Sequence, residues 1–194
     1  QIGSAHGAVC GKTGETRVTW TPPLSLAEEI TDAVAGDCVL TATTYSGSSV
    51  VGTSSCPIKL YVPEEVKPTA SLAAQVVNDN AVIAGWGVCV RGYRRMAYQV
   101  TAAGARGSSI RSCRVQFAGQ TAEGLTGQTG MIQQAGTLIP EARVTDSRGR
   151  WATAQGGAVE VLPYANTTLT ARLLGRCGAD GTLRDDGDCV KVLC

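Results

Sequence analysis

The chain of 194 residues carries 17 Lys and Arg against 16 Asp and Glu, with one histidine, 8 cysteines and 24 glycines. This length allows one large domain or two domains of ~100 residues, each able to bury a hydrophobic core. A net charge of +1 argues against a dedicated nucleic-acid binder, and no apolar run approaches the ~18–20 residues that span a bilayer. Because 43% of the residues are apolar and the glycines lack a three-residue period, the chain is neither disordered nor collagen-like.

Both ends of the sequence look cut. The segment Gln1–Cys10 has no initiating methionine and lacks the basic and apolar regions of a signal peptide. At the other end, Asp188–Cys194 has the pattern of a strand that stops without a turn or a polar tail. We therefore expect a fragment of a longer protein, so the lack of a targeting signal says nothing about its location.

Short strands dominate the predicted secondary structure. The first, Thr16–Thr21, precedes the only segment of helical character, Leu24–Val34, where Ser25 and Glu28 have the spacing of a capping box. Alternating or β-branched runs then follow, separated by turn clusters. Strands about ten residues apart are typical of a β-sandwich or barrel. In chain order these predicted strands are Cys38–Tyr45, Ser49–Val62, Ala81–Val90, Ala97–Ala102, Ile110–Phe117, Leu138–Thr145, Trp151–Leu162 and Thr167–Leu174.

An internal repeat organises the chain. A shift of 100 residues places Ala35-Gly36 on Ala135-Gly136 and Val62-Pro63 on Leu162-Pro163. That period exceeds the roughly 20–50 residues of solenoid repeats and is the length of an immunoglobulin-type β-sandwich. We therefore predict an all-β fold of tandem Ig-like modules joined at prolines, which keep the chain extended. The predicted division is the C-terminal part of one module at 1–64, a complete module at 65–164 and the opening strands of a third at 165–194.

The hairpin and joint motifs resemble the Ig-like repeats of siphophage tail proteins. Thr145–Arg150, which reads Thr-Asp-Ser-Arg-Gly-Arg, looks like the closing hairpin of those repeats, and Val159–Tyr164, Val-Glu-Val-Leu-Pro-Tyr, looks like their exit. Trp20–Ala27 and Thr43–Gly47 resemble the preceding repeat, and Arg176–Thr182 resembles the start of the following one. The resemblance covers nearly the whole chain. It implies a minor tail, tail-fibre or tail-tip protein of phages and prophages of Firmicutes, whose repeats carry no catalytic residues.

The closing turn holds the candidate contact residues. Asp146 can accept backbone N–H bonds and Gly149 can adopt a positive φ, so we predict a structural hairpin turn with Arg148 and Arg150 pointing into solvent. An alternative interpretation has these two arginines, together with Trp151, contacting a glycan or a partner protein. A tryptophan one residue into a strand, however, more often packs at the edge of a core.

The sequence predicts no enzyme, no cofactor and no metal site. A Ser-His-Asp or Cys-His arrangement would depend on the single histidine, His6, close to the N-terminus. Glu28 and Glu29 are adjacent and suit a solvated face better than acid–base chemistry. The acidic loop Asp180–Asp188 fails the spacing of a calcium loop, and no C-x-x-C pair exists for zinc.

Cysteine pairing stays open from the sequence. Cys38 and Cys56 are equidistant from Gly47, and Cys177 and Cys189 are equidistant from the centre of their own hairpin. If each turn is centred there, both pairs face each other across antiparallel strands. We predict them as candidate disulfides worth ~2–3 kcal/mol each. The alternative is that the cysteines are small buried apolar residues, and eight cysteines allow 105 connectivities.

Three functions from different classes remain. We rank first a structural module that spaces or decorates a phage tail or fibre, surrounded by other tail subunits in a homo-oligomer and located in the virion. Second is a module that binds a host-surface glycan or protein through loops at one end of the sandwich. Third is a secreted, extracellular bacterial adhesin or filament subunit built on the same fold. None of the three inserts into a membrane or binds nucleic acid.

Overall fold

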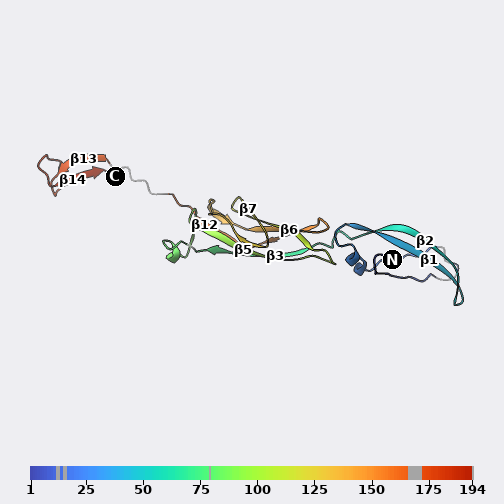
Figure 1. Ribbon diagram of the computed structural model, residues 1–194. Coiled ribbons are helices and arrows are strands. Elements are labelled where there is room, and N and C mark those ends of the chain that lie inside the picture. Colours follow the sequence, from blue (N-terminus) through green and yellow to red (C-terminus); the bar gives the residue numbers. More distant parts are fainter. Residues whose placement is uncertain (12–13, 15–16, 79, 166–171, 194) are drawn as a thin grey trace. The chain divides into compact units, whose positions relative to one another are not determined.

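The computed structural model describes residues 1–11, 14, 17–78, 80–165 and 172–193, in two compact units, Gln1–Pro163 and Tyr164–Cys194 (Figure 1). The fold is all-β, with two short 3-10 helices in the part of the chain described. The first unit contains, in order, η1 (Leu24–Glu29), β1 (Ala35–Ser46), β2 (Ser49–Tyr61), β3 (Thr69–Val77), η2 (Ala84–Trp86), β4 (Cys89–Val90), β5 (Arg95–Ala103), β6 (Ile110–Phe117), β7 (Gln120–Glu123), β8 (Thr126–Gln128), β9 (Gly136–Leu138), β10 (Glu141–Asp146), β11 (Trp151–Gln155) and β12 (Val159–Leu162). The second contains β13 (Arg172–Cys177) and β14 (Cys189–Leu193).

The segment of helical character forms one short 3-10 helix. η1 ends at Glu29, and its N-cap is Pro23, which has no side-chain hydrogen-bonding group. The expected capping box at Ser25 is therefore wrong, because the prolines start the helix before that residue. The buried face of η1 packs into a small apolar cluster beside β1 and β2. This cluster consists of Ile2, Leu26, Ala27, Ile30, Val62 and Val66.

A long antiparallel hairpin, β1–β2, follows η1 (Figure 1). Ser46 lies opposite Ser49 at the tip, and a bulge between Thr44 and Tyr45 shifts the register further down. On the other edge of β1, Gln1 and Val39 exchange both backbone hydrogen bonds, with N···O distances of 2.7 and 2.9 Å. Most apolar side chains of the hairpin remain exposed, among them Val39, Leu40, Tyr45, Val50, Val51, Ile58 and Tyr61.

Within the first unit, residues 69–162 form three further sheets around the main core. The strand orders are β3-β5-β8, β11-β10-β6-β7 and β4-β12-β9. Buried and outward positions alternate along β5, β6 and β10, as expected for strands with one face on a core. The core side chains are Met96, Tyr98, Val100, Cys113, Val115, Phe117, Ile132, Ala142, Val144 and Val161.

Several predicted strands differ from the structure, and one of them, Leu138–Thr145, is broken at residues 139–140 between β9 and β10. Ala81–Val90 forms turns and η2, with only its last two residues in a strand, because the Asn80 side chain accepts the Val82 N–H at 3.0 Å and Gly87 adopts a left-handed φ of 69°. The predicted strand Trp151–Leu162 is interrupted by a glycine pair at 156–157 and divides into β11 and β12. The structure adds β3, β7 and β8, none of which the sequence predicted. Residues 17–21 form no strand, and 167–171 of the last predicted strand lie outside the described residues.

The second unit is an antiparallel hairpin. β13 pairs with β14, and Cys177 lies directly opposite Cys189. In the connecting loop, both carboxylate oxygens of Asp180 accept hydrogen bonds from Thr182, at 3.0 and 3.1 Å. These bonds, the backbone one first, lower the pKa of Asp180. Arg176 Nε donates to the Gly187 carbonyl at 2.9 Å, which ties the loop to β13.

Candidate functional site

The β10–β11 turn connects the central sheets to the η1 region. Asp146 is fully buried, and its Oδ1 accepts the backbone N–H groups of Arg148 and Arg150 at 3.0 and 2.9 Å. Gly149 has φ 81°. This closed turn directs the two arginine side chains toward residues 27–66, more than 80 positions earlier in the chain. We call this contact region the joint.

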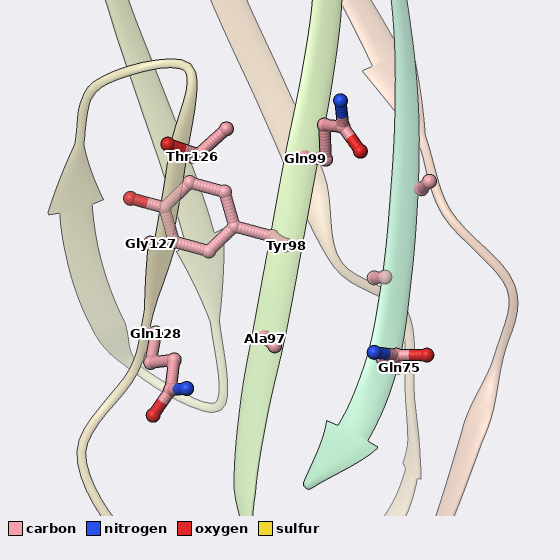
Figure 2. Close-up of a pocket in the computed structure, with 9 residues that line it drawn as sticks. Gln75, Ala97, Tyr98, Gln99, Thr126, Gly127 and Gln128 are labelled. Atoms are coloured by element: carbon pink, nitrogen blue, oxygen red, sulfur yellow. The ribbon is translucent and has the colours of Figure 1, made fainter.

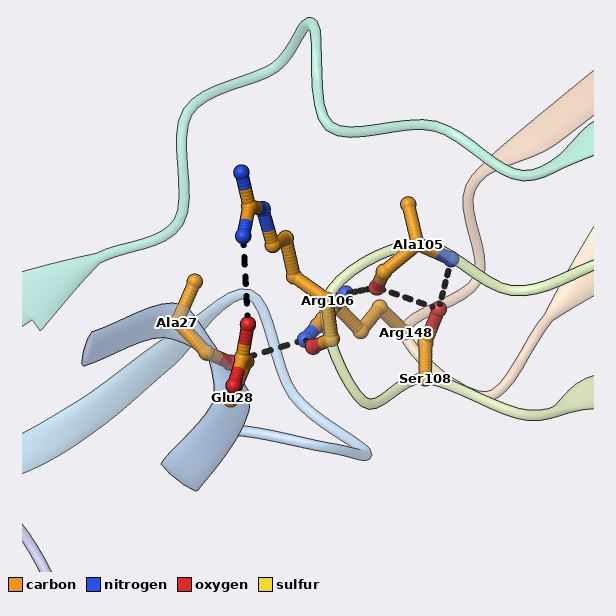
Figure 3. Close-up of polar contacts among 6 residues, drawn as sticks. All are labelled: Ala27, Glu28, Ala105, Arg106, Ser108 and Arg148. Atoms are coloured by element: carbon orange, nitrogen blue, oxygen red, sulfur yellow. Dashed lines mark hydrogen bonds and ion pairs between the residues drawn. The ribbon is translucent and has the colours of Figure 1, made fainter. Parts of the chain in front are cut away.

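Arg148 is buried in the joint, with only 6% of its surface exposed. Its Nε donates to the Ile30 carbonyl at 2.7 Å. Its Nη2 donates to the Ala27 carbonyl at 2.9 Å (Figure 3). Both carbonyls lie at the C-terminal end of η1, where a helix has free capacity for further donors. The Ala27 carbonyl also accepts the Ile30 N–H at 3.1 Å. Nη1 donates to the Ala105 carbonyl at 2.6 Å, and Nη2 also reaches the Arg106 carbonyl. One guanidinium therefore connects η1 to the loop after β5.

Burial lowers the pKa of Arg148, while the Asp146 carboxylate acts in the opposite direction. A guanidinium stays protonated even when its pKa is lowered, and its planar fork of donors suits several acceptors at once. The positive charge is thus held by carbonyl dipoles together with the nearby carboxylate. This environment explains how an arginine can be buried here.

The loop after β5 has the right shape to receive Arg148. Ser108 Oγ accepts the Ala105 N–H at 3.0 Å, and Arg106 adopts an uncommon positive φ of 48° (Figure 3). The Arg106 side chain forms an ion pair with Glu28 of η1, with Nη1 3.2 Å from Oε1. Both partners are about half exposed, so this pair contributes little by itself.

Arg150 and Ser147 make further contacts in the joint. The Arg150 guanidinium donates to the carbonyls of Val62, Pro63 and Val66, the last at 2.9 Å. Ser147 Oγ reaches the Thr31 carbonyl. The expectation that both arginines point into solvent is therefore wrong. Their acceptors are main-chain carbonyls, which no side-chain pattern in the sequence reveals.

A pocket of about 620 Å³ opens beside the joint. Tyr61 and Trp151 supply its aromatic side chains, and Arg150 lines it as well. The Arg143 guanidinium lies 4.3 Å from the centroid of the Trp151 ring, in cation–π contact. The structure thus brings Arg150 and Trp151 together at this pocket, whereas Arg148 lies in the interior. The other lining residues are Val34, Val62, Pro63, Glu64, Lys67 and Gly149.

A second hollow lies on the β3–β5–β8 sheet (Figure 2). Small residues such as Ala73 and Ala97 line it, and its polar side chains are those of Thr126 and of glutamines that include Gln75 and Gln99. Tyr98 also lines it, but the side chain is buried and its hydroxyl donates to the Glu123 carbonyl at 3.2 Å. No charged residue lines this hollow among those described.

The cysteines fit the sequence interpretation only in part. Cys38 lies opposite Ile58, and Cys56 lies opposite Leu40, so the predicted facing of Cys38 and Cys56 is wrong. The turn is centred between Gly47 and Ser48 instead of on Gly47, which moves the partner of each β1 residue by one position along β2. The bulge moves it by one more, so Cys38 lies opposite Ile58 instead of Cys56. All four candidate cysteines are free thiols in the structure. A Cys177–Cys189 disulfide stays a prediction.

Among the described residues, no group of three or more His, Cys, Asp or Glu side chains could hold a metal ion. A search of those same residues finds no helix with the length and apolar character needed to cross a membrane.

Comparison with known proteins gives one family match. A family model described as "Siphovirus protein of unknown function (DUF859)" matches residues 1–179. No curated protein matches the chain. Among solved structures, the PKD1 domain from the Vibrio cholerae metalloprotease PrtV is 21% identical with a TM-score of 0.30, over 47% of this chain and 96% of that chain.

Proposed function

This chain belongs to the siphovirus protein family DUF859, and on that premise we propose that it is a structural section of the phage tail, built of Ig-like modules and acting as a spacer or decoration. The role involves no catalysis. Its partners are other tail or fibre subunits, including further copies of the same chain, and its location is the virion. The joint carries this proposal.

A spacer has to keep the angle between neighbouring modules, and the joint has the contacts to do so. Arg148 and Arg150 together reach seven main-chain carbonyls on η1, on the loop after β5 and on residues 62–66. Hydrogen bonds from a charged donor are roughly twice as strong as neutral ones. Because the acceptors are backbone atoms on three segments, a change of angle at the joint would break several bonds together.

The hairpin registers support a repeated module. In β10–β11, Glu141 lies opposite Gln155 and Val144 lies opposite Ala152. A shift of 100 residues converts these into Thr41 opposite Ser55 and Thr44 opposite Gly52, which are pairs of β1–β2. The two pairs between them correspond in the same way. Equal spacing on two hairpins is the expected result of one module used twice.

The edge of β1 supports the proposal that residues 1–64 are the later part of such a module. β10 pairs with β11 on one edge and antiparallel with β6 on the other. β1 pairs with β2, while on its other edge the only ladder contact in the described residues is the one from Gln1 to Val39. An antiparallel strand along that edge, continuing the Gln1 contact, would complete the sheet.

Antibody labelling of this region in intact phage particles, viewed by cryo-electron microscopy, tests the proposal. We expect label along the tail or its tip. Label on bacterial filaments or cell surfaces without capsids would instead support a secreted adhesin and overturn the tail assignment.

A further inference from the structure

Two exposed aromatic rings meet at the joint pocket. Tyr61 ends β2 and is 68% exposed, while Trp151 begins β11 and is 48% exposed. The two residues are 90 positions apart in the sequence, yet both line one pocket of about 620 Å³. That volume lies within the roughly 300–1,000 Å³ typical of small-molecule sites. Aromatic side chains that line one hollow together with a few polar groups are typical of small-molecule sites.

The polar groups of the pocket suit a ligand that both donates and accepts hydrogen bonds. Glu64 and Lys67 line it, and within the described part of the chain neither side chain takes part in an ion pair or hydrogen bond. The Arg150 guanidinium also lines the pocket, but its donors are engaged by the carbonyls of Val62, Pro63 and Val66. The groups left for a ligand are one carboxylate and one ammonium, whose opposite charges favour a ligand without net charge. The carboxylate accepts and the ammonium donates, so together they can bind neighbouring hydroxyl groups.

The aromatic platform is held in place before any ligand arrives. Arg143 stacks on Trp151 at 4.3 Å but does not line the pocket, so it fixes the ring from outside. Arg150, which directly precedes Trp151 in the chain, is held by carbonyls of residues 62–66. A site that needs little reorganisation loses less entropy on binding.

From these observations we propose that the joint pocket binds a neutral sugar ring of a surface glycan. Tyr61 and Trp151 pack against the C–H faces of the ring, whose hydrogens are attracted to the negative faces of aromatic rings. Glu64 and Lys67 bind its hydroxyl groups. The inference does not depend on where the protein sits in the particle, so its failure would leave the structural role untouched.

Glucose, galactose, rhamnose and N-acetylglucosamine, each titrated into the full 194-residue protein, are the probes. Backbone amide NMR shifts report both affinity and position. We expect at least one of these sugars to bind at millimolar or lower concentration and to shift the amides of residues 61–67 and 149–151. Trp151→Ala and Tyr61→Ala should each weaken binding about tenfold or more, the factor that corresponds to about 1.4 kcal/mol.

Matched controls come from the same chain. Trp86 is also 48% exposed and Tyr45 is 61% exposed, and neither lines the pocket. Trp86→Ala and Tyr45→Ala should leave sugar affinity unchanged, as should Gln99→Ala in the hollow of Figure 2. Circular dichroism checks that every variant is folded.

Several results would overturn the proposal. One is that none of the four sugars binds, either at a 50-fold molar excess over the protein or at the solubility limit of the sugar. Another is equal loss of affinity in the Trp86 or Gln99 variants. Binding of a proline-rich peptide at residues 61–67 without any sugar binding would assign the pocket to a protein ligand instead.

Discussion

Replacing Arg148 by alanine should open the joint while leaving the main core intact. The side chain donates to four carbonyls, and those of Ala27 and Ile30 belong to buried residues that water reaches poorly. A buried acceptor left without a donor costs roughly 1–3 kcal/mol. The Ala27 carbonyl keeps the Ile30 N–H as a donor at 3.1 Å, whereas among the described residues the Ile30 carbonyl is left without one, so we expect a destabilisation of about 1–3 kcal/mol at the joint. The Ala105 and Arg106 carbonyls lie on less buried residues, where water can replace the lost donor.

Hydrogen exchange measured by mass spectrometry follows this opening directly. The Leu26 and Ile30 amides donate within η1, to the Pro23 and Ala27 carbonyls, and should lose protection. At the lower limit of about 1 kcal/mol, exchange in residues 24–34 should accelerate roughly fivefold. The amides of β5 and β6 should keep their protection, because their core cluster is separate from that of η1.

Arg143→Ala is the matched control. Arg143 lies on the same hairpin, is exposed and stacks on Trp151 without touching any joint carbonyl, so its loss should cost about 1 kcal/mol or less. If Arg148→Ala changes exchange in residues 24–34 no more than Arg143→Ala does, the joint is not held by the buried guanidinium. If β5 and β6 open together with η1, the two regions form one cooperative unit, and the reasoning from separate clusters fails.

Four further predictions concern glycines, the core and the thiols. Gly107→Ala should destabilise the protein by roughly 1 kcal/mol more than Gly149→Ala, as measured by urea unfolding. Both residues have φ near +80°, but a Cβ at position 107 would lie 3.0 Å from the Glu28 carbonyl oxygen, whereas position 149 is open. Equal unfolding midpoints for the two variants would contradict this. Phe117→Ala should cost about 3–5 kcal/mol of unfolding free energy, against less than about 0.5 kcal/mol for the exposed Val82→Ala, and a small effect at Phe117 would mean that the core is not where the structure places it. Burial raises the pKa of Cys113, so at pH 8 iodoacetamide should alkylate it more slowly than the exposed Cys10. The difference between the two alkylation rates should narrow as the pH rises, and equal rates at pH 8 would refute the burial of Cys113. Under oxidising conditions, intact-mass and peptide analysis should find a Cys177–Cys189 bond and no Cys38–Cys56 bond, and recovery of Cys177 and Cys189 as alkylated thiols without reduction would exclude it.

Local patterns were sufficient for much of the sheet structure. Ile110–Phe117 was predicted as a strand with the bounds of β6, because Cys113, Val115 and Phe117 alternate with polar residues and the alternation follows from the two-residue repeat of a strand. The all-β class and the hairpin at Asp146–Arg150 follow from similarly local signals. β3 was missed because its alanine- and serine-containing sequence, Thr69–Val77, lacks the bulky β-branched pattern and is a strand through its pairing with β5.

Tertiary structure alone decided the register of β1–β2 and the role of the arginines. The position of the turn and a bulge at Thr44/Tyr45 together move Cys38 away from Cys56, and a bulge is a property of the pairing that composition does not specify. From the sequence, Arg148 looks like a surface residue, because it is a charged side chain in a hairpin turn. It is buried because folding brings the carbonyls of Ala27 and Ile30, 121 and 118 residues earlier, into reach of its guanidinium. Every residue carries such a carbonyl, so only the three-dimensional arrangement determines which of them an arginine will meet.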